Sequence, residues 1–203
     1  MDRRTLVSGA LLMGAAPSVA ASQTTPAAQG RSTGDEARTA IADALARYCR
    51  AWDRCDVELA LTVWHPDGTA QYLAEPVAPV ASFIPQRLNG RRDLGMVTSH
   101  QITSMVVHAR GDRAASEAYG TAWTQQRTAD GQVKQHHYFH RYLDRWSRRA
   151  GVWAIDHRRV ILDGYSVQIV VGGDPALDKA LGASRSGPDD PSYAHFADFE
   201  SEA

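Results

Sequence analysis

Two side chains of the sequence would form a general base if the fold brought them together. Asp53 follows Trp52 near the end of an amphipathic stretch, and His100 stands at the start of a strand-like run, within "VTSHQITSMVV". A carboxylate that accepts a hydrogen bond from one ring nitrogen of a histidine fixes its tautomer and makes the other nitrogen a stronger base. In a dry pocket such a pair can remove a proton from carbon or from a hydroxyl group. Each residue alone also suits a structural role, since a helix-end carboxylate is usually solvated or capping.

The histidines of "HHYFH" are a second candidate site. On a strand, His136 and His140 share a face but lie roughly 13 Å apart at about 3.3 Å per residue, while His137 points away. Three such rings cannot chelate one ion without a bulge, so no metal site is predicted. The same alternation places Tyr138, His140 and Tyr142 on one face. His140 is then either a second catalytic or substrate-orienting group, or an outward-facing or structurally bonded histidine.

The elements that must position these residues follow from hydrophobic periodicity. From Asp35, apolar residues recur at spacings of three and four as far as Trp52, which predicts a helix with one buried face. A second helix is predicted over about 57–64, stopped by the turn "HPDG". A strand begins at Gly68, and longer strands separated by glycine-containing turns are predicted over about 100–109, 114–127, 133–147 and 152–171.

This order of elements predicts the fold class. Helices come first, and the long strands that follow are consecutive and joined by short turns, so they should be antiparallel. We therefore expect an α+β domain in which a strongly curved sheet is closed on one face by helices. The segment 75–97 carries three prolines and reads as a loop or a short helix rather than a central strand.

Length and charge limit the kind of partner. A chain of 203 residues is long enough for one domain with a sizeable core. The net charge is −1, from 22 Lys and Arg against 23 Asp and Glu, so there is no basic field to hold nucleic acid or an anionic membrane. The partner is expected to be a small molecule or another copy of the chain.

The two ends of the chain differ from the central domain, predicted over residues 35–171. Residues 1–21 have paired arginines, an apolar run and small residues, the layout of an export signal resembling the twin-arginine type, which predicts a periplasmic mature protein. Residues 22–34 read as a polar linker. The tail, 172–203, has no periodicity, although its aromatic residues Tyr193, Phe196 and Phe199 suggest docking on the domain or on a neighbour.

The only two cysteines, Cys49 and Cys55, are candidates for a disulfide in an exported chain. Six positions of a helix separate two Cα atoms by roughly 9 Å, beyond the limit of about 7 Å for a bridge. Unless the helix ends between them, both are expected to stay free thiols.

Several segments, taken together, resemble the SnoaL-like branch of the nuclear transport factor 2-like superfamily. They are "RYCRAWDRCDVELALTVWHPDGTA", "TSHQIT", "GDRAASEAY" and "HRYLDRWSRRAGVWAIDHRRVILD", in that order along about two thirds of the chain. The resemblance implies a cone: a curved antiparallel sheet wrapped around helices, with a deep apolar pocket. It also implies dimers or trimers, and it places the segment 75–97 at the mouth of the pocket as a lid or an oligomer contact.

The resemblance also implies roles for single residues. The superfamily includes scytalone dehydratase, bile acid 7α-dehydratase and hexachlorocyclohexane dehydrochlorinase, whose aspartate and histidine match Asp53 and His100. Their tyrosine before the aspartate matches Tyr48, a proton donor to a departing hydroxyl. A basic residue in the last strand matches Arg158, which would stabilise developing negative charge.

Further residues would bind the substrate. The face that carries His140 lines the pocket in the dehydrochlorinase, so Tyr138 and Tyr142 are expected there too. On the preceding strand, Glu117, Tyr119 and Trp123 share a face and are expected either to line the cavity or to make structural cross-strand contacts.

Three functions remain open on this basis. The first is a cofactor-independent lyase that acts on an apolar cyclic or aromatic hydroxylated molecule and releases water, or formaldehyde as do the diarylpropane lyases of the superfamily. The second is an isomerase or cyclase that uses the same Asp53 and His100. The third is a binding protein without catalysis.

Overall fold

The computed structural model describes residues 33–170 and 186–201. The predicted export signal, nearly all of the predicted linker and residues 171–185 lie outside the described residues. The helices are α1 (Gly34–Arg54), α2 (Val57–Leu61), α3 (Val80–Asp93) and α5 (Pro191–Ser201). The strands are β1 (Trp64–Tyr72), β2 (Ala78–Pro79), β3 (Val97–Arg110), β4 (Arg113–Arg127), β5 (Val133–Arg149) and β6 (Val152–Val170).

Helix α1 forms the centre of the core, as its pattern predicts. Its start is closed by a capping box, in which the Thr33 side chain accepts from the Glu36 amide and the Glu36 carboxylate accepts from the Thr33 amide. The apolar stripe, from Ala37 to Trp52, is buried. The helix stops at Cys55, whose φ of 50° is left-handed and ends the helical hydrogen-bond ladder. Both cysteines are free and buried.

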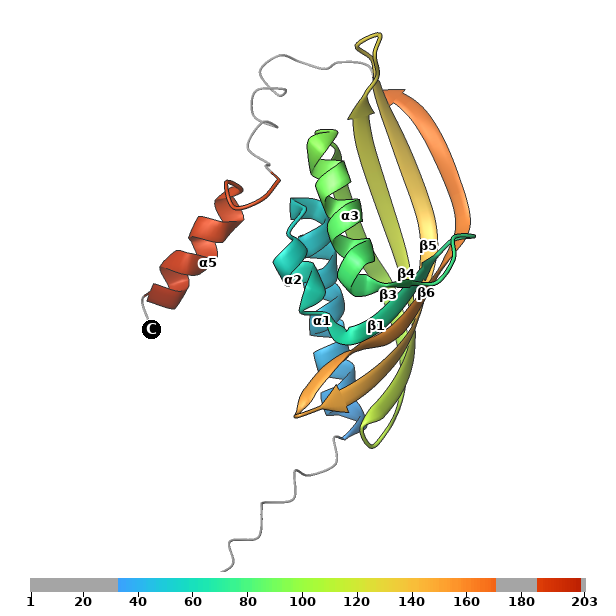
Figure 1. The fold of residues 1–203 in the computed structure, drawn as a ribbon, viewed down its shortest axis with the longest axis vertical. Coiled ribbons are helices and arrows are strands. Elements are labelled where there is room, and N and C mark those ends of the chain that lie inside the picture. The colour runs from blue at the N-terminus through green and yellow to red at the C-terminus, as the bar shows by residue number, and fades with distance from the viewer. Residues whose placement is uncertain (1–32, 171–185, 202–203) are drawn as a thin grey trace, which may run out of the picture.

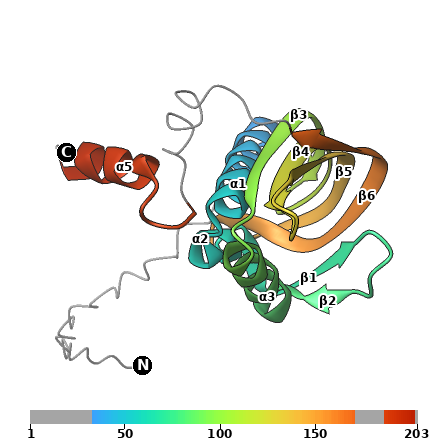
Figure 2. The ribbon, with the colours of Figure 1, turned by 90° about the horizontal axis from the view of Figure 1, so that it is seen from above.

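The six strands form one sheet in the order β2-β1-β6-β5-β4-β3. The four long strands pair antiparallel through consecutive hairpins, which confirms the predicted α+β architecture. Strand β1 instead runs parallel to β6. The sheet curves strongly, and α1, α2 and α3 lie on its concave side (Figures 1 and 2).

The structure corrects the predicted end of the second helix and the turn after it. Helix α2 ends at Leu61, and "HPDG" belongs to β1 rather than to a turn. The register between β1 and β6 shifts between Trp64 and Thr69, so this end of the strand is bulged. A Cβ at Gly68 would lie 2.8 Å from the carbonyl oxygen of His65, so the bulge needs glycine. The residues of "HPDG", which are typical of turns, here form the irregular start of strand β1.

The segment 75–97 is mainly helical, which is one of the two forms predicted for it. It contains the short strand β2 and a helix of 14 residues, α3, which includes Pro85. Its buried side chains, Val80, Phe83, Ile84 and Leu88, recur at helical spacing. The three prolines hide this pattern, yet α3 packs beside β1 and closes one side of the concave space (Figure 2).

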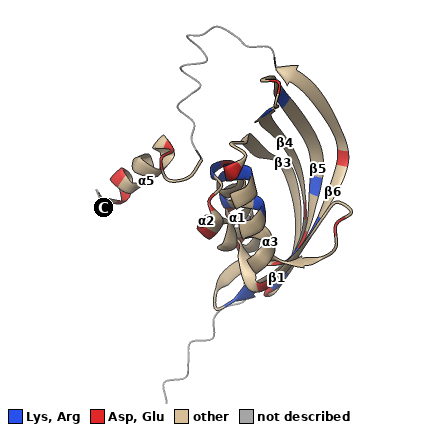
Figure 3. Ribbon diagram, turned by 45° about the horizontal axis from the view of Figure 1, so that its top comes forward, with Lys and Arg blue, Asp and Glu red and all other residues tan. Residues whose placement is uncertain are grey.

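The tail contains a helix that its sequence pattern does not predict. Helix α5 has only acidic charged residues and stands apart from the sheet (Figures 1 and 3). The Tyr193 hydroxyl donates to Asp56 at 2.5 Å, and the Arg50 guanidinium lies 4.6 Å from the Tyr193 ring centroid. Tyr193 thus contacts the domain, whereas Phe199 is 70% exposed.

No helix in the described part of the chain is long and apolar enough to cross a bilayer.

Candidate active site

A cavity of about 260 Å³ lies between the helices and the concave face of the sheet. Its wall is largely aromatic, with Tyr48, Trp52, Tyr72, Tyr138 and Tyr142. His100 and His140 reach it from β3 and β5, and Arg87 and Arg91 reach it from α3. A small, mostly apolar space with a few polar groups is the usual form of a site for a small molecule.

Asp53 and His100 meet at this cavity. The Nδ1 atom of His100 lies 2.7 Å from Oδ1 of Asp53, and the backbone amide of His100 donates to Oδ2 of Asp53 at 3.1 Å. Both side chains are largely buried: 10% of the His100 side chain and 16% of the Asp53 side chain are exposed. Because a carboxylate only accepts, Nδ1 of His100 carries the proton, and Nε2 is left as the basic nitrogen.

The local structure explains why the pair forms. Trp52 packs in the core while the next position of α1, Asp53, turns toward β3 near the end of the helix. Thr98, two residues before His100 on β3, places its hydroxyl 3.2 Å from Nδ1 of His100 and 3.5 Å from Oδ1 of Asp53. Asp53 does not line the cavity, so it acts on a ligand only through His100.

His140 faces the same cavity from β5, together with Tyr138 and Tyr142, as strand alternation predicts. Its Nε2 atom is buried and has no hydrogen-bond partner among the described residues. Burial, followed by His100 and Arg158, lowers the pKa of His140 to about 4. His140 is therefore neutral near pH 7.

Two tyrosine hydroxyls form a buried pair at the cavity wall. The hydroxyl groups of Tyr48 and Tyr72 are hydrogen-bonded to each other. Burial is the main cause that raises the pKa of each well above the usual value, so both stay protonated and can donate. Tyr72 has no signal in the sequence beyond its place in a strand, because its partner Tyr48 is 24 positions away.

Arg158 lies behind this wall and not in it. Its side chain is fully buried and donates to both carboxylate oxygens of Asp144, at 2.7 and 2.8 Å. Its guanidinium carbon lies 4.2 Å from the ring centroid of Tyr48 and 4.0 Å from that of Tyr142. The expectation that Arg158 faces developing charge in the pocket is thus corrected. Asp144 compensates its charge, and Arg158 instead supports the two tyrosine rings from behind.

The expected cavity residues of β4 lie on the wrong face. Glu117, Tyr119 and Trp123 alternate with Ala118, Ala122 and Thr124, and the latter face the helices. Tyr119 is 45% exposed, and Glu117 pairs with Arg141 on the outer face at 2.9 Å. Of the two roles expected for these residues, none of the three lines the cavity, and Glu117 makes the structural cross-strand contact. The period of two is visible in the sequence, but which face points inward depends on the register with β5.

The remaining histidines of "HHYFH" diverge. The His136 ring stacks near Tyr138, with centroids 6.1 Å apart, while His137 contacts Gln135. Within the described residues, no group of three or more histidine, cysteine, aspartate or glutamate side chains is arranged to hold a metal ion.

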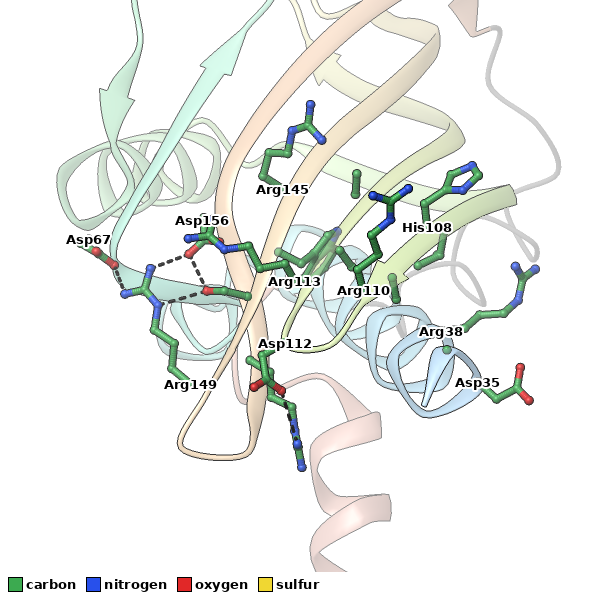
Figure 4. A pocket seen from close by; sticks show the side chains of 18 residues that line it. Asp35, Arg38, Asp67, His108, Arg110, Asp112, Arg113, Arg145, Arg149 and Asp156 are labelled. Atoms are coloured by element: carbon green, nitrogen blue, oxygen red, sulfur yellow. Dashed lines mark hydrogen bonds and ion pairs between the residues drawn. The ribbon is translucent and has the colours of Figure 1, made fainter. Parts of the chain in front are cut away.

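A larger hollow lies at the other end of the domain, around the start of α1 and the turns β3-β4 and β5-β6 (Figure 4). Its wall is rich in arginine, and Arg149 pairs there with Asp67 and Asp156. His108 is its only histidine and has no carboxylate bonded to it among the described residues. Its described lining residues include no histidine bonded to a carboxylate, so the hollow lacks the acid–base pair of the smaller cavity.

Solved structures with the same fold are distantly related in sequence. A protein of Novosphingobium aromaticivorans, provisionally named a scytalone dehydratase, is 16% identical, with 68% of this chain and 91% of that chain covered and a TM-score of 0.58. A type 2 hexachlorocyclohexane dehydrochlorinase is 14% identical, with 68% and 93% covered and a TM-score of 0.55. A protein of Kribbella flavida is 20% identical, with 66% and 95% covered and a TM-score of 0.60. A comparison with curated proteins finds no match.

The family itself is shown by a sequence model. The model of the SnoaL-like domain matches residues 35–159, which include α1, the curved sheet as far as the middle of β6, and both members of the Asp53–His100 pair. This match covers more than half of the chain. The protein therefore belongs to the SnoaL-like domain family.

Proposed function

We propose that this protein is a cofactor-independent lyase that removes water or formaldehyde from an apolar cyclic or aromatic hydroxylated small molecule. One observation carries the proposal. A histidine in the wall of an aromatic cavity has one ring nitrogen held by a buried carboxylate at 2.7 Å, which leaves the other nitrogen free to act as a base. The dehydratase and dehydrochlorinase names among the structural relatives agree with an elimination.

The first step is the same for both leaving groups. Nε2 of His100 takes a proton from the substrate, and Asp53 stabilises the imidazolium that forms. In dehydration the proton comes from carbon, the neighbouring C–O bond breaks, and the hydroxyl leaves as water with a proton from Tyr48, which His100 restores. In formaldehyde release the proton comes from a CH₂OH group, the C–C bond breaks, and the carbon left behind takes a proton back from His100.

The groups around His100 suit such a step. The Tyr48 and Tyr72 hydroxyls stay protonated, and when Tyr72 donates to Tyr48 within the pair, the Tyr48 proton can be donated to the leaving oxygen. His140 is neutral near pH 7, so it can orient a substrate hydroxyl without adding charge to the cavity. The small volume and aromatic wall favour a compact ring compound.

The test is mass spectrometry of purified protein incubated, without added cofactor, with hydroxylated steroids and lignin-derived diaryl diols. We expect a product lighter by water or by formaldehyde with the wild type and none with His100→Ala. His108→Ala, on the same strand but outside the cavity, is the matched control and should keep full turnover. A product of unchanged mass and new retention time would favour an isomerase or cyclase, and binding without turnover would favour a carrier.

We also propose that the mature protein is periplasmic, on the strength of residues 1–21. Cell fractionation with N-terminal sequencing tests this. Export and cleavage near Ala20 or Ala21 are expected, with loss of export when Arg3 and Arg4 are both changed to Lys. Export of the double variant at wild-type level would exclude the twin-arginine route.

Self-association is the third part of the proposal. The outer face of the sheet exposes large apolar side chains, with Val106 and Phe139 each 52% exposed and Tyr119 45% exposed. Such a surface is typical of an interface. Light scattering coupled to size exclusion should give a dimer or trimer, and a monomer at 100 μM would contradict it.

A further inference from the structure

Among the described residues that line the cavity, Arg91 has the most buried side-chain donors without a hydrogen-bond partner. It lies in the last turn of α3 and reaches the cavity beside Trp52, with its guanidinium carbon 5.4 Å from the Trp52 ring centroid. Its Nε and Nη2 atoms are both buried and have no hydrogen-bond partner among the described residues. A buried donor without an acceptor is unfavourable, and more so when the group is charged.

The two other arginines near the cavity are each paired with a carboxylate. Arg87, one turn earlier on α3, pairs with Glu75, and Arg158, behind the wall, pairs with Asp144. Among the described residues of the lining, Glu75 is the only one with a carboxylate, and Glu75 pairs with Arg87. Arg91 therefore leaves one positive charge uncompensated in the wall.

We infer that Arg91 binds a carboxylate of the ligand, so that the substrate is an aromatic or cyclic acid. A guanidinium presents two parallel N–H groups that match the two oxygens of a carboxylate, and the exchange of buried unpaired donors for a charged pair is favourable. Trp52 supports the guanidinium on one side and an apolar ring of the ligand can pack on the remaining aromatic wall.

The position of Arg91 would fix the orientation of a bound acid in the cavity. Arg91 belongs to α3, whereas His100 and His140 belong to β3 and β5, so the acid group and the histidines approach one ligand from different elements. As a statement about the substrate, this inference rests on the proposed function. As a statement about binding, it stands without turnover.

The test compares two probes that differ only in charge, 4-hydroxybenzoate and 4-hydroxybenzamide, by isothermal titration calorimetry in low salt. The wild type should bind the acid at least about tenfold more tightly than the amide, the range of one charged hydrogen-bonded pair. Arg91→Gln should abolish this preference, and Arg91→Lys should keep part of it. Arg92→Gln is the matched control, because Arg92 is the next residue of α3, carries the same charge and contacts Cys55 outside the cavity.

His100→Ala separates this inference from the proposed function. The variant should lose turnover and retain the preference for the acid. The inference is overturned if the wild type binds the acid no better than the amide, including the case in which neither binds, or if the preference survives in Arg91→Gln. The proposed function fails by a different result, the absence of any lyase product, which leaves the acid preference intact.

Discussion

Asp144 and Arg158 form a bidentate ion pair with no exposed surface on either side chain, directly behind the tyrosines of the cavity. Asp144 on β5 and Arg158 on β6 are register partners in the sheet, so the pair also joins the two strands. The pair keeps the pKa of Arg158 raised even though burial disfavours the charge.

Breaking this pair should destabilise the whole domain. Asp144→Asn leaves the Arg158 charge buried and uncompensated, which typically costs about 3–5 kcal/mol. The free energy of unfolding, from urea titration, measures the effect. Asp163→Asn is the control, because it removes a carboxylate of β6 from the partly exposed Arg141, where a loss of about 1 kcal/mol or less is expected. Equal losses in the two variants would contradict a special role for the buried pair.

Asp53 should determine the tautomer of His100. In the wild type, ¹⁵N chemical shifts of neutral His100 should report a proton on Nδ1, because the Asp53 carboxylate accepts from that atom. In Asp53→Asn the amide can donate as well as accept, so a shift toward the Nε2–H form is expected, with turnover lower by about 10²-fold or more. A wild-type proton on Nε2 would refute the assignment of His100 as the base.

His140 should make stability depend on pH. Its pKa in the folded protein is about 4, below the ordinary 6.5, so the unfolded chain binds the proton more strongly. The stabilisation is therefore fully present above about pH 6.5 and is lost as the pH falls toward 4, by roughly 3 kcal/mol at most. Urea titrations across this range should show a weaker pH dependence for His140→Gln. Titration of the His140 ring near pH 6.5 by NMR would contradict the prediction.

Gly120 should be required opposite His140. A Cβ at Gly120 would lie 2.5 Å from Nε2 of His140 and 3.1 Å from the carbonyl oxygen of Gln101. Gly120→Ala should push the ring out of its place and cost about 1–3 kcal/mol, as overpacking does. Gly164→Ala on β6 is the control, because its nearest contact would be 3.9 Å, and it should be close to neutral. Restoration of stability in Gly120→Ala combined with His140→Ala would identify the ring as the cause.

The local sequence pattern by itself determined most of the secondary structure of this protein. The stripe of α1, the four long strands and their glycine turns are readable because periods of 3.6 and 2 reflect backbone geometry within each element. Alternation likewise placed Tyr138, His140 and Tyr142 on one face. The pairing of Asp53 with His100 was expected only through the family resemblance, since 47 positions separate the two residues.

Only the tertiary structure decided which faces and which charges belong to the cavity. The register of β4 against β5 turns Ala122 and Thr124 inward and Tyr119 and Trp123 outward, although both sets alternate equally well in the sequence. Arg158 does not face the pocket, because Asp144 on the neighbouring strand binds it behind the wall. Arg91 does face the pocket, because α3 packs against the open side of the sheet. The prolines of this segment obscure its helical pattern in the sequence. These outcomes depend on contacts between residues far apart in the chain, which no local period encodes.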